Sequence, residues 1–171
     1  MRQVSKEQRK DIQSLRDILM MLCITLERRM MKKHLFCKRV SFFVRYEDKT
    51  AYEDRFQTNQ PLQDGMDIYH ILEERQKVFE QKNKLILPII NQNATSIGLV
   101  IWDFIHEDIV QLNIFDNSHI KTNKVRKTVY DIKDKYGNKM IQRASELRDE
   151  DVVDDVIGFG SVKDVNISDY E

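Results

Sequence analysis

Apolar residues recur at steps of three and four near the start of the chain, between Lys6 and Met31. The charged residues of this stretch fall largely off the apolar stripe, as they do on the solvent side of an amphipathic helix. The pattern therefore predicts a long helix with one buried face. Its predicted buried stripe comprises Ile12, Leu15, Leu19, Leu22, Leu26 and Met30.

The spacing changes to alternation after this helix. Residues 35–46 read LFCKRVSFFVRY, in which Val40, Phe42 and Val44 stand between polar or basic neighbours. This pattern predicts a strand with one apolar and one basic face. The turn formers EDK and the alternating residues 52–58 (YEDRFQT) follow, so we expect the strand to be the first arm of a hairpin.

A second helix is predicted over residues 66–81, MDIYHILEERQKVFEQ. Asp64 or Asp67 is a suitable cap, because an Asp side chain accepts hydrogen bonds from the first free backbone amides of a helix. The apolar spacing predicts that this helix buries Ile68, Ile71, Leu72, Val78 and Phe79.

The next apolar segment is interrupted before it becomes regular. Residues 85–94 are expected to form a helix end and a loop, because Pro88 argues against a central strand. Residues 96–105, SIGLVIWDFI, are almost continuously apolar, which favours a strand at the centre of a sheet. Gly98 would let another backbone approach this strand closely, and Trp102 is expected to belong to the core.

The order helix, strand, strand, helix, strand predicts an α+β fold, with two helices packed on one face of a small antiparallel or mixed sheet. The other face is expected to be bare, with Lys38 or Arg39, Arg45 and Arg55 pointing there. A bare, basic sheet face is a suitable surface for a phosphate backbone. Base stacking, as in RNA-recognition sheets, is only weakly supported, because the sequence has no RNP-type aromatic motif.

The C-terminal part of the chain is predicted to be a helical or extended tail. Val125, Val129 and Ile132 have helical spacing, which predicts a short third helix over about residues 121–136. Gly137 follows as a typical helix stop.

Charge is spread unevenly along the 171 residues, although the net charge is zero. Residues 1–58 contain 14 Lys or Arg and 8 Asp or Glu, a net +6, and residues 59–145 contain 12 and 11, a net +1. Residues 146–171 contain 2 and 9, a net −7. This distribution fits an anionic partner for the front of the chain together with a solvated acidic end, but charge alone favours an ordinary surface with a disordered acidic tail.

Several functional classes have no support in the sequence. No apolar run approaches the ~18 residues that a bilayer span needs, and the charged start MRQVSKEQRK is unlike a signal peptide. Cys23 and Cys37 form no metal or disulfide motif, so we expect two reduced thiols in a cytoplasmic protein. The four histidines lack metal-ligand spacing. We therefore expect no metal, cofactor or catalytic residue in this chain.

Residues 111–116, QLNIFD, end the apolar region in an unusual way. Leu112, Ile114 and Phe115 could be core residues at the end of an edge strand. The same three residues could instead fill an apolar cleft on another protein, with Gln111 making polar contacts at its rim. The peptide by itself is compatible with both interpretations.

Four stretches, in order, resemble the C-terminal part of Y-family translesion DNA polymerases of the DinB/UmuC type. They are LERRMMKKHLFCKRVSFFVRYED, MDIYHILEERQKVF, SIGLVIWDF with DIVQLNIFD, and VYDIKDKYGNKMIQRAS, and the resemblance covers roughly residues 8–145. It implies that residues 1–110 form the little-finger domain, that 111–116 bind the sliding clamp, and that 117–171 are a C-terminal extension. The segment Gln3-Val4-Ser5 would be a remnant of the first strand.

The resemblance also implies partners and contact residues. In that family the little finger contacts the phosphates of duplex template–primer DNA, partly through backbone amides, and such contacts carry little sequence information. The implied clamp-binding residues are Gln111, Leu112, Ile114 and Phe115, and the implied DNA-binding residues are Lys38, Arg39, Arg45, Lys49, Arg55, Thr95 and Ser96. One departure is that family members often carry Arg just before the last strand, where this chain has Ala94, Thr95 and Ser96, so less charge is available there.

The catalytic palm of such polymerases lies upstream of the little finger and holds the Mg²⁺-binding carboxylates. We therefore expect a non-catalytic little-finger fragment, which grips the DNA and tethers its parent polymerase, a Mg²⁺ enzyme, to the clamp. The alternative hypothesis is a free-standing protein-interaction module that does not bind DNA. Only the first hypothesis predicts a duplex affinity that falls steeply with salt.

Overall fold

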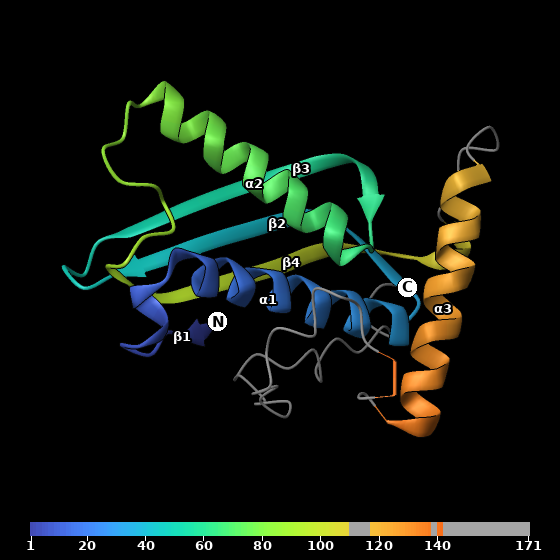
Figure 1. The fold of residues 1–171 in the computed structure, drawn as a ribbon. Coiled ribbons are helices and arrows are strands. Elements are labelled where there is room, and N and C mark those ends of the chain that lie inside the picture. Colours follow the sequence, from blue (N-terminus) through green and yellow to red (C-terminus); the bar gives the residue numbers. More distant parts are fainter. Residues whose placement is uncertain (110–116, 138–139, 142–171) are drawn as a thin grey trace, which may run out of the picture. The chain divides into compact units, whose positions relative to one another are not determined.

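The structure is a computed structural model that describes residues 1–109, 117–137 and 140–141. The predicted clamp peptide and the acidic end of the chain lie outside these residues. The described elements are β1 (Arg2–Gln3), the 3-10 helix η1 (Gln8–Lys10), α1 (Ile12–Lys32), β2 (Leu35–Tyr46), β3 (Ala51–Leu62), α2 (Gly65–Lys82), β4 (Ala94–His106), the 3-10 helix η2 (Glu107–Ile109) and α3 (Asn117–Tyr136) (Figure 1).

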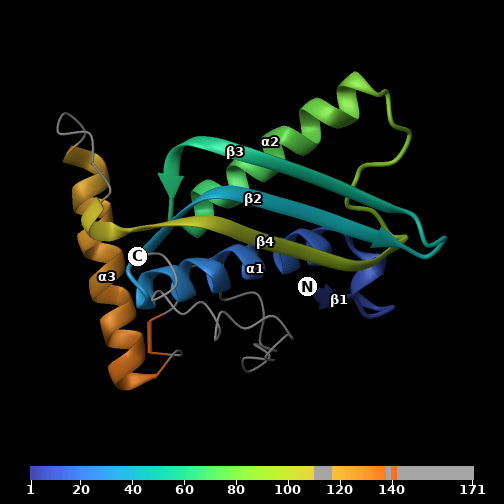
Figure 2. The same ribbon diagram turned by 180° about the vertical axis from the view of Figure 1, so that it is seen from behind.

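The strands form one four-stranded sheet in the order β1-β4-β2-β3, and every pairing is antiparallel. Helices α1 and α2 lie on one face of this sheet (Figure 1), and the view from behind shows β2, β3 and β4 with neither helix in front of them (Figure 2). The predicted α+β fold is confirmed, and the sheet is antiparallel rather than mixed.

Alternate residues of β2 fix which face the helices cover. Val40, Phe42 and Val44 are fully buried in the core, together with Leu15 and Leu19 of α1. Burying each such apolar side chain stabilises the fold by about 1.5–3 kcal/mol relative to leaving it in water. The core therefore lies between the sheet and the helices, and the residues between these positions on β2 face away from it.

Helix α1 begins later than its apolar spacing predicted. The carboxylate of Asp11 accepts hydrogen bonds from the backbone amides of Gln13 (3.0 Å) and Ser14 (3.1 Å), which satisfies two otherwise unpaired donors. The helix consequently starts at Ile12, and the residues from Lys6 onward include the separate turn η1.

The predicted buried stripe of α1 is correct only in part. Leu15, Leu19 and Met30 are buried, but Ile12 is 44% exposed because it occupies the first turn of the helix. Helix α1 packs against α2 as well as against the sheet, so its buried face also takes in Ile18.

Helix α2 is capped by Asp64, whose carboxylate accepts a hydrogen bond from the Met66 amide at 2.8 Å, and this decides between the two predicted caps. Ile68 and Leu72 are buried as predicted, but the prediction is wrong for Val78 and Phe79, which are 63% and 40% exposed. Both views show the C-terminal end of α2 reaching past β3 (Figures 1 and 2), although the Phe79 ring still packs edge-on against Tyr52 of β3, with the ring centroids 5.0 Å apart.

Strand β2 has the predicted bounds, whereas β3 and β4 are longer than predicted. Strand β4 lies between β1 and β2, so the prediction of a central position is confirmed. The segment before β4 is a loop, as predicted from Pro88, and its Ile89 carbonyl accepts a hydrogen bond from the Tyr46 hydroxyl at 2.8 Å. The short first strand consists of Arg2 and Gln3.

The two cysteines are free and buried, as expected. Burial raises the pKa of Cys37 to about 12 and also raises the pKa of Cys23. Since the thiolate is the reactive form, neither thiol is activated for chemistry.

A buried ionic cluster joins all three helices. Glu27 of α1 is fully buried, and its Oε2 accepts a hydrogen bond from the Gly65 amide at the first residue of α2 (3.0 Å). Arg126 of α3 is also buried, with its Nη1 2.6 Å from Asp64 Oδ2 and 3.7 Å from Glu27 Oε1. A Cβ on Gly65 would lie 2.8 Å from the Cys23 carbonyl oxygen, so only glycine fits this close approach. The cluster therefore fixes α3 to the ends of the other two helices.

We predict that Arg126→Gln lowers the free energy of unfolding by about 3 kcal/mol, because it leaves a buried carboxylate without its counter-charge. Urea unfolding followed by circular dichroism measures this loss. The control is Lys127→Gln on the exposed side of the same helix, which should stay within about 0.5 kcal/mol of the unmodified protein. Equal stabilities of the two variants would show that Arg126 contributes no more than a surface residue.

Candidate nucleic-acid interface

The candidate interface is the sheet face that α1 and α2 leave uncovered. Strand β2 contributes alternate residues to it, and the pairing register places the facing residues of β3 and β4 beside them. The helix-free face thus consists of Arg39, Ser41, Phe43 and Arg45 from β2, Glu53, Arg55 and Gln57 from β3, and Ser96, Gly98, Val100 and Trp102 from β4.

Two of the three arginines that were predicted to lie on this face form ion pairs with carboxylates. Arg39 Nε lies 3.4 Å from Asp103 Oδ2, and Arg55 Nε lies 2.6 Å from Glu53 Oε1. Hydrogen bonds from Arg55, and then from Ser41, lower the pKa of Glu53, so this carboxylate stays ionised on the face. The helix-free face is therefore less positive than its arginines alone suggest.

Arg45 differs from these two arginines. It makes no ion pair with any residue in the described part of the chain, and its guanidinium carbon lies 5.9 Å from the centre of the Phe43 ring. It lies opposite Ser96 in the register, and the Thr95 hydroxyl donates a hydrogen bond to its carbonyl at 3.0 Å. The structure thus brings together three predicted DNA-binding residues, although the Ser96 side chain is buried.

The remaining predicted residues lie apart from this group. Lys38 occupies the irregularity between Cys37 and Arg39, where the register of β2 and β3 shifts, and it is half-buried. Lys49 lies in the turn between β2 and β3, with a positive φ of 67°, and it is exposed. Lys49 is therefore at the Arg45 end of the sheet, whereas Lys38 is near the other end.

Basic residues near the start of the chain were missed by the sequence analysis. The Val4 amide donates to the Thr95 carbonyl at 2.9 Å, which carries the following turn η1 to the Arg45 end of the sheet. There Lys6, Arg9, Lys10, Glu47 and Gln92 line a depression of about 290 Å³. Arg9 pairs with Glu47, whereas Lys6 and Lys10 are exposed. The basic run KEQRK could have indicated these residues, but the apolar spacing placed it in the long helix.

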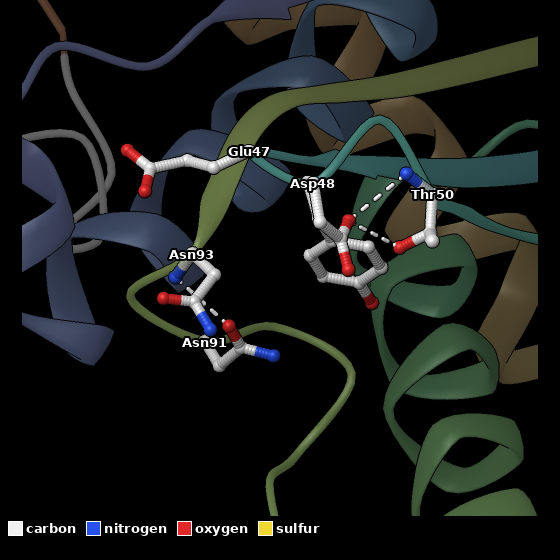
Figure 3. Close-up of a pocket in the computed structure, with 6 residues that line it drawn as sticks. Glu47, Asp48, Thr50, Asn91 and Asn93 are labelled. Carbon is white, nitrogen blue, oxygen red and sulfur yellow. Dashed lines mark hydrogen bonds between the residues drawn. The ribbon is translucent and has the colours of Figure 1, made fainter.

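A larger polar pocket of about 380 Å³ lies at the same end, lined by Tyr46, Glu47, Asp48, Thr50, Asn91 and Asn93 (Figure 3). Asp48 accepts hydrogen bonds from the amide and hydroxyl of Thr50, at 2.9 and 2.6 Å, and Asn91 accepts one from the Asn93 amide at 2.9 Å. These bonds stabilise the turns around the pocket. No group of metal-ligating side chains occurs within the described residues.

The middle of the helix-free face is apolar, which the sequence analysis did not expect. Gly98 was predicted to let another backbone approach, but the space above it is occupied by the ring of Phe43. A Cβ added to Gly98 would lie 2.0 Å from Phe43 Cζ. Val100 is 49% exposed, and Trp102 is partly exposed in the register position opposite Arg39. The assignment of Trp102 to the core is wrong, because β4 turns this side chain away from the helices.

The sequence comparison matches this architecture to a known class of domain. The profile of the impB/mucB/samB family C-terminal domain matches residues 3–114, which run from β1 past the end of β4. The chain therefore belongs to this family, and the matched residues are the little-finger domain of a Y-family polymerase. No curated protein matches the chain. Within its described part, no helix is long and apolar enough to cross a membrane.

We predict that Gly98→Ala destabilises the domain by about 1–3 kcal/mol, because the new methyl group must displace the Phe43 ring. Chemical denaturation of Gly98→Ala, Phe43→Ala and the double variant measures the coupling between the two positions. The cost of Gly98→Ala should largely disappear in the Phe43→Ala background, since the obstructing ring is then absent. Additive losses would contradict the ring-over-glycine contact.

Proposed function

We propose that this little-finger domain grips the backbone of duplex template–primer DNA without catalysing a reaction, and that residues 111–116 tether it to the sliding clamp. The observation that carries the DNA part is the gathering of cationic side chains at one end of the sheet. Arg45 lies on the helix-free face at this end, and the bond from Val4 to Thr95 brings Lys6 and Lys10 to the same end, where they line a depression.

The chemistry of this end suits phosphate groups. Lys6, Lys10 and Lys49 are exposed ammonium groups, and Arg45 is a guanidinium without a carboxylate partner among the described residues. Contacts from such groups position a duplex and do not read its sequence, which fits a polymerase that must bind any template. Arg39 and Arg55 are expected to contribute less, because their neighbouring carboxylates repel phosphate.

The clamp part of the proposal rests on the family and on the composition of QLNIFD. A short peptide with two or three apolar anchors concentrates its binding energy in a small area. Even a weak contact of this kind raises the effective concentration of the polymerase at the primer end. The tether therefore adds residence time without adding DNA contacts.

We predict that the triple variant Lys6→Gln, Lys10→Gln, Arg45→Gln weakens duplex binding. The slope of log K against log salt concentration should also become shallower by nearly three, because each lost phosphate contact contributes about 0.9 to it. Fluorescence anisotropy with a labelled duplex between about 50 and 200 mM salt measures both quantities. The matched control is Lys77→Gln, Lys82→Gln, Lys84→Gln, which removes three exposed charges from α2 and the loop after it. An equal effect of the control would place the contact elsewhere, and no affinity of the unmodified protein at about 50 mM salt would favour the protein-interaction alternative.

We predict that Gln111→Ala with Phe115→Ala lowers retention of the protein on immobilised sliding clamp by more than about tenfold, because both the polar rim contact and an apolar anchor are lost. Ile109→Ala is the matched control, since Ile109 is exposed and lies just before the peptide. Unchanged retention of the double variant would remove the tether from the proposal while leaving DNA binding untouched.

A further inference from the structure

The ring of Phe43 lies flat on the backbone of β4. A Cβ built on Gly98 would be 2.0 Å from Phe43 Cζ and 2.5 Å from both Cε1 and Cε2. Equal distances to the two Cε atoms, only slightly longer than the distance to Cζ, place that point almost directly above Cζ, at the tip of the ring and on one side of its plane. One ring face therefore covers Gly98, and the opposite face is directed away from the sheet.

Two further apolar residues continue this surface along β4. Val100 lies opposite Ser41 and is 49% exposed, and Trp102 lies opposite Arg39 and is partly exposed. We call Phe43, Val100 and Trp102 the apolar strip. Arg45 lies at the Phe43 end, with its guanidinium carbon 5.9 Å from the ring centre, and Arg39, which is paired with Asp103, lies at the Trp102 end.

Packing within the sheet does not account for the whole strip. An aromatic ring over a cross-strand glycine stabilises a sheet, and this explains why Phe43 faces Gly98. It does not explain why the helix-free face keeps Val100 open and carries Trp102, the single tryptophan of the chain. Flat aromatic surfaces with cationic borders are the arrangement that binds single-stranded nucleic acids, in which bases stack on rings and phosphates pair with Arg.

We propose that the apolar strip binds unpaired nucleobases, and thus the single-stranded stretch of DNA that adjoins a duplex. This inference rests on the proposed contact of the same face with DNA. It specifies that the middle of the face binds single-stranded DNA. The faces of paired bases are stacked within a duplex and only their edges are accessible, so the strip can stack only on unpaired bases. Glu53 and Asp103, which reduce the charge of this face, make stacking relatively more important than phosphate contacts.

Trp102 provides a direct readout, because stacking of a nucleobase on its ring quenches its fluorescence. The full chain is titrated with a blunt duplex and with the same duplex carrying a single-stranded oligo-dT overhang, and anisotropy and tryptophan emission are recorded together. We expect the overhang to raise affinity by about tenfold, the usual effect of stacking one or two bases. We expect Trp102 emission to fall only with the overhang.

Phe43→Leu should reduce the ratio of overhang affinity to blunt-duplex affinity to about one, and this ratio is unaffected by any loss of duplex binding through the neighbouring Arg45. Phe79→Leu on α2 is the matched control and should keep the advantage, because Phe79 lies on the helix side of the molecule. If Phe43→Leu does not fold, the quenching of the unmodified chain still decides the question.

The outcomes separate this inference from the proposed function. Equal binding of both DNAs with unchanged Trp102 emission overturns the strip proposal alone, and leaves the strip as a surface for a protein. Binding of neither DNA at about 50 mM salt overturns both proposals. Binding of the overhang with quenching supports the strip whether or not the blunt duplex binds.

Discussion

The structure depends on the burial of one sheet face under two helices. The core residues Val40, Phe42, Val44 and Ile97 have no measurable exposure, and α1 supplies Leu15 and others from the opposite side. The alternation of β2 then sends every intervening residue to the other side. The binding surface proposed for this protein is thus a direct consequence of how its core is packed.

The helix-free face combines two kinds of surface that a sequence of basic residues does not reveal. At one end of the sheet, backbone pairing of segments far apart in the chain brings Lys6 and Lys10 to the same end as Arg45. In the middle, Glu53 and Asp103 offset two arginines while the Phe43 ring covers Gly98. Exposed ion pairs of this kind contribute little to stability, about 0–1 kcal/mol each, so their main effect is on the potential that a ligand meets. Charged groups therefore lie at the ends of the face, and apolar side chains lie in its middle.

Element types were predictable wherever a single period governed the sequence. The 3.6-residue period of α1, the alternation of β2 and the cap at Asp64 depend on neighbours within a few residues, and the structure has each of them. Burial was less predictable, because it depends on what lies opposite. Val78 continues the apolar spacing of α2, yet it is 63% exposed. Of the candidate DNA-binding residues, the structure brings only Thr95 and Ser96 beside Arg45, because strand register and not sequence spacing decides which residues are neighbours.

The sequence by itself determined the order of helices and strands, the α+β class and the likeness to the little-finger family, since these follow from local periodicity and short motifs. Only the tertiary structure decided which side chains share the helix-free face, which arginines are paired with carboxylates, and that Trp102 points outward. It also revealed the cluster in which Glu27, Gly65 and Arg126 join three helices. The physical reason is that hydrogen-bonded register and ion pairing act between residues that are tens of positions apart, so no local pattern specifies them.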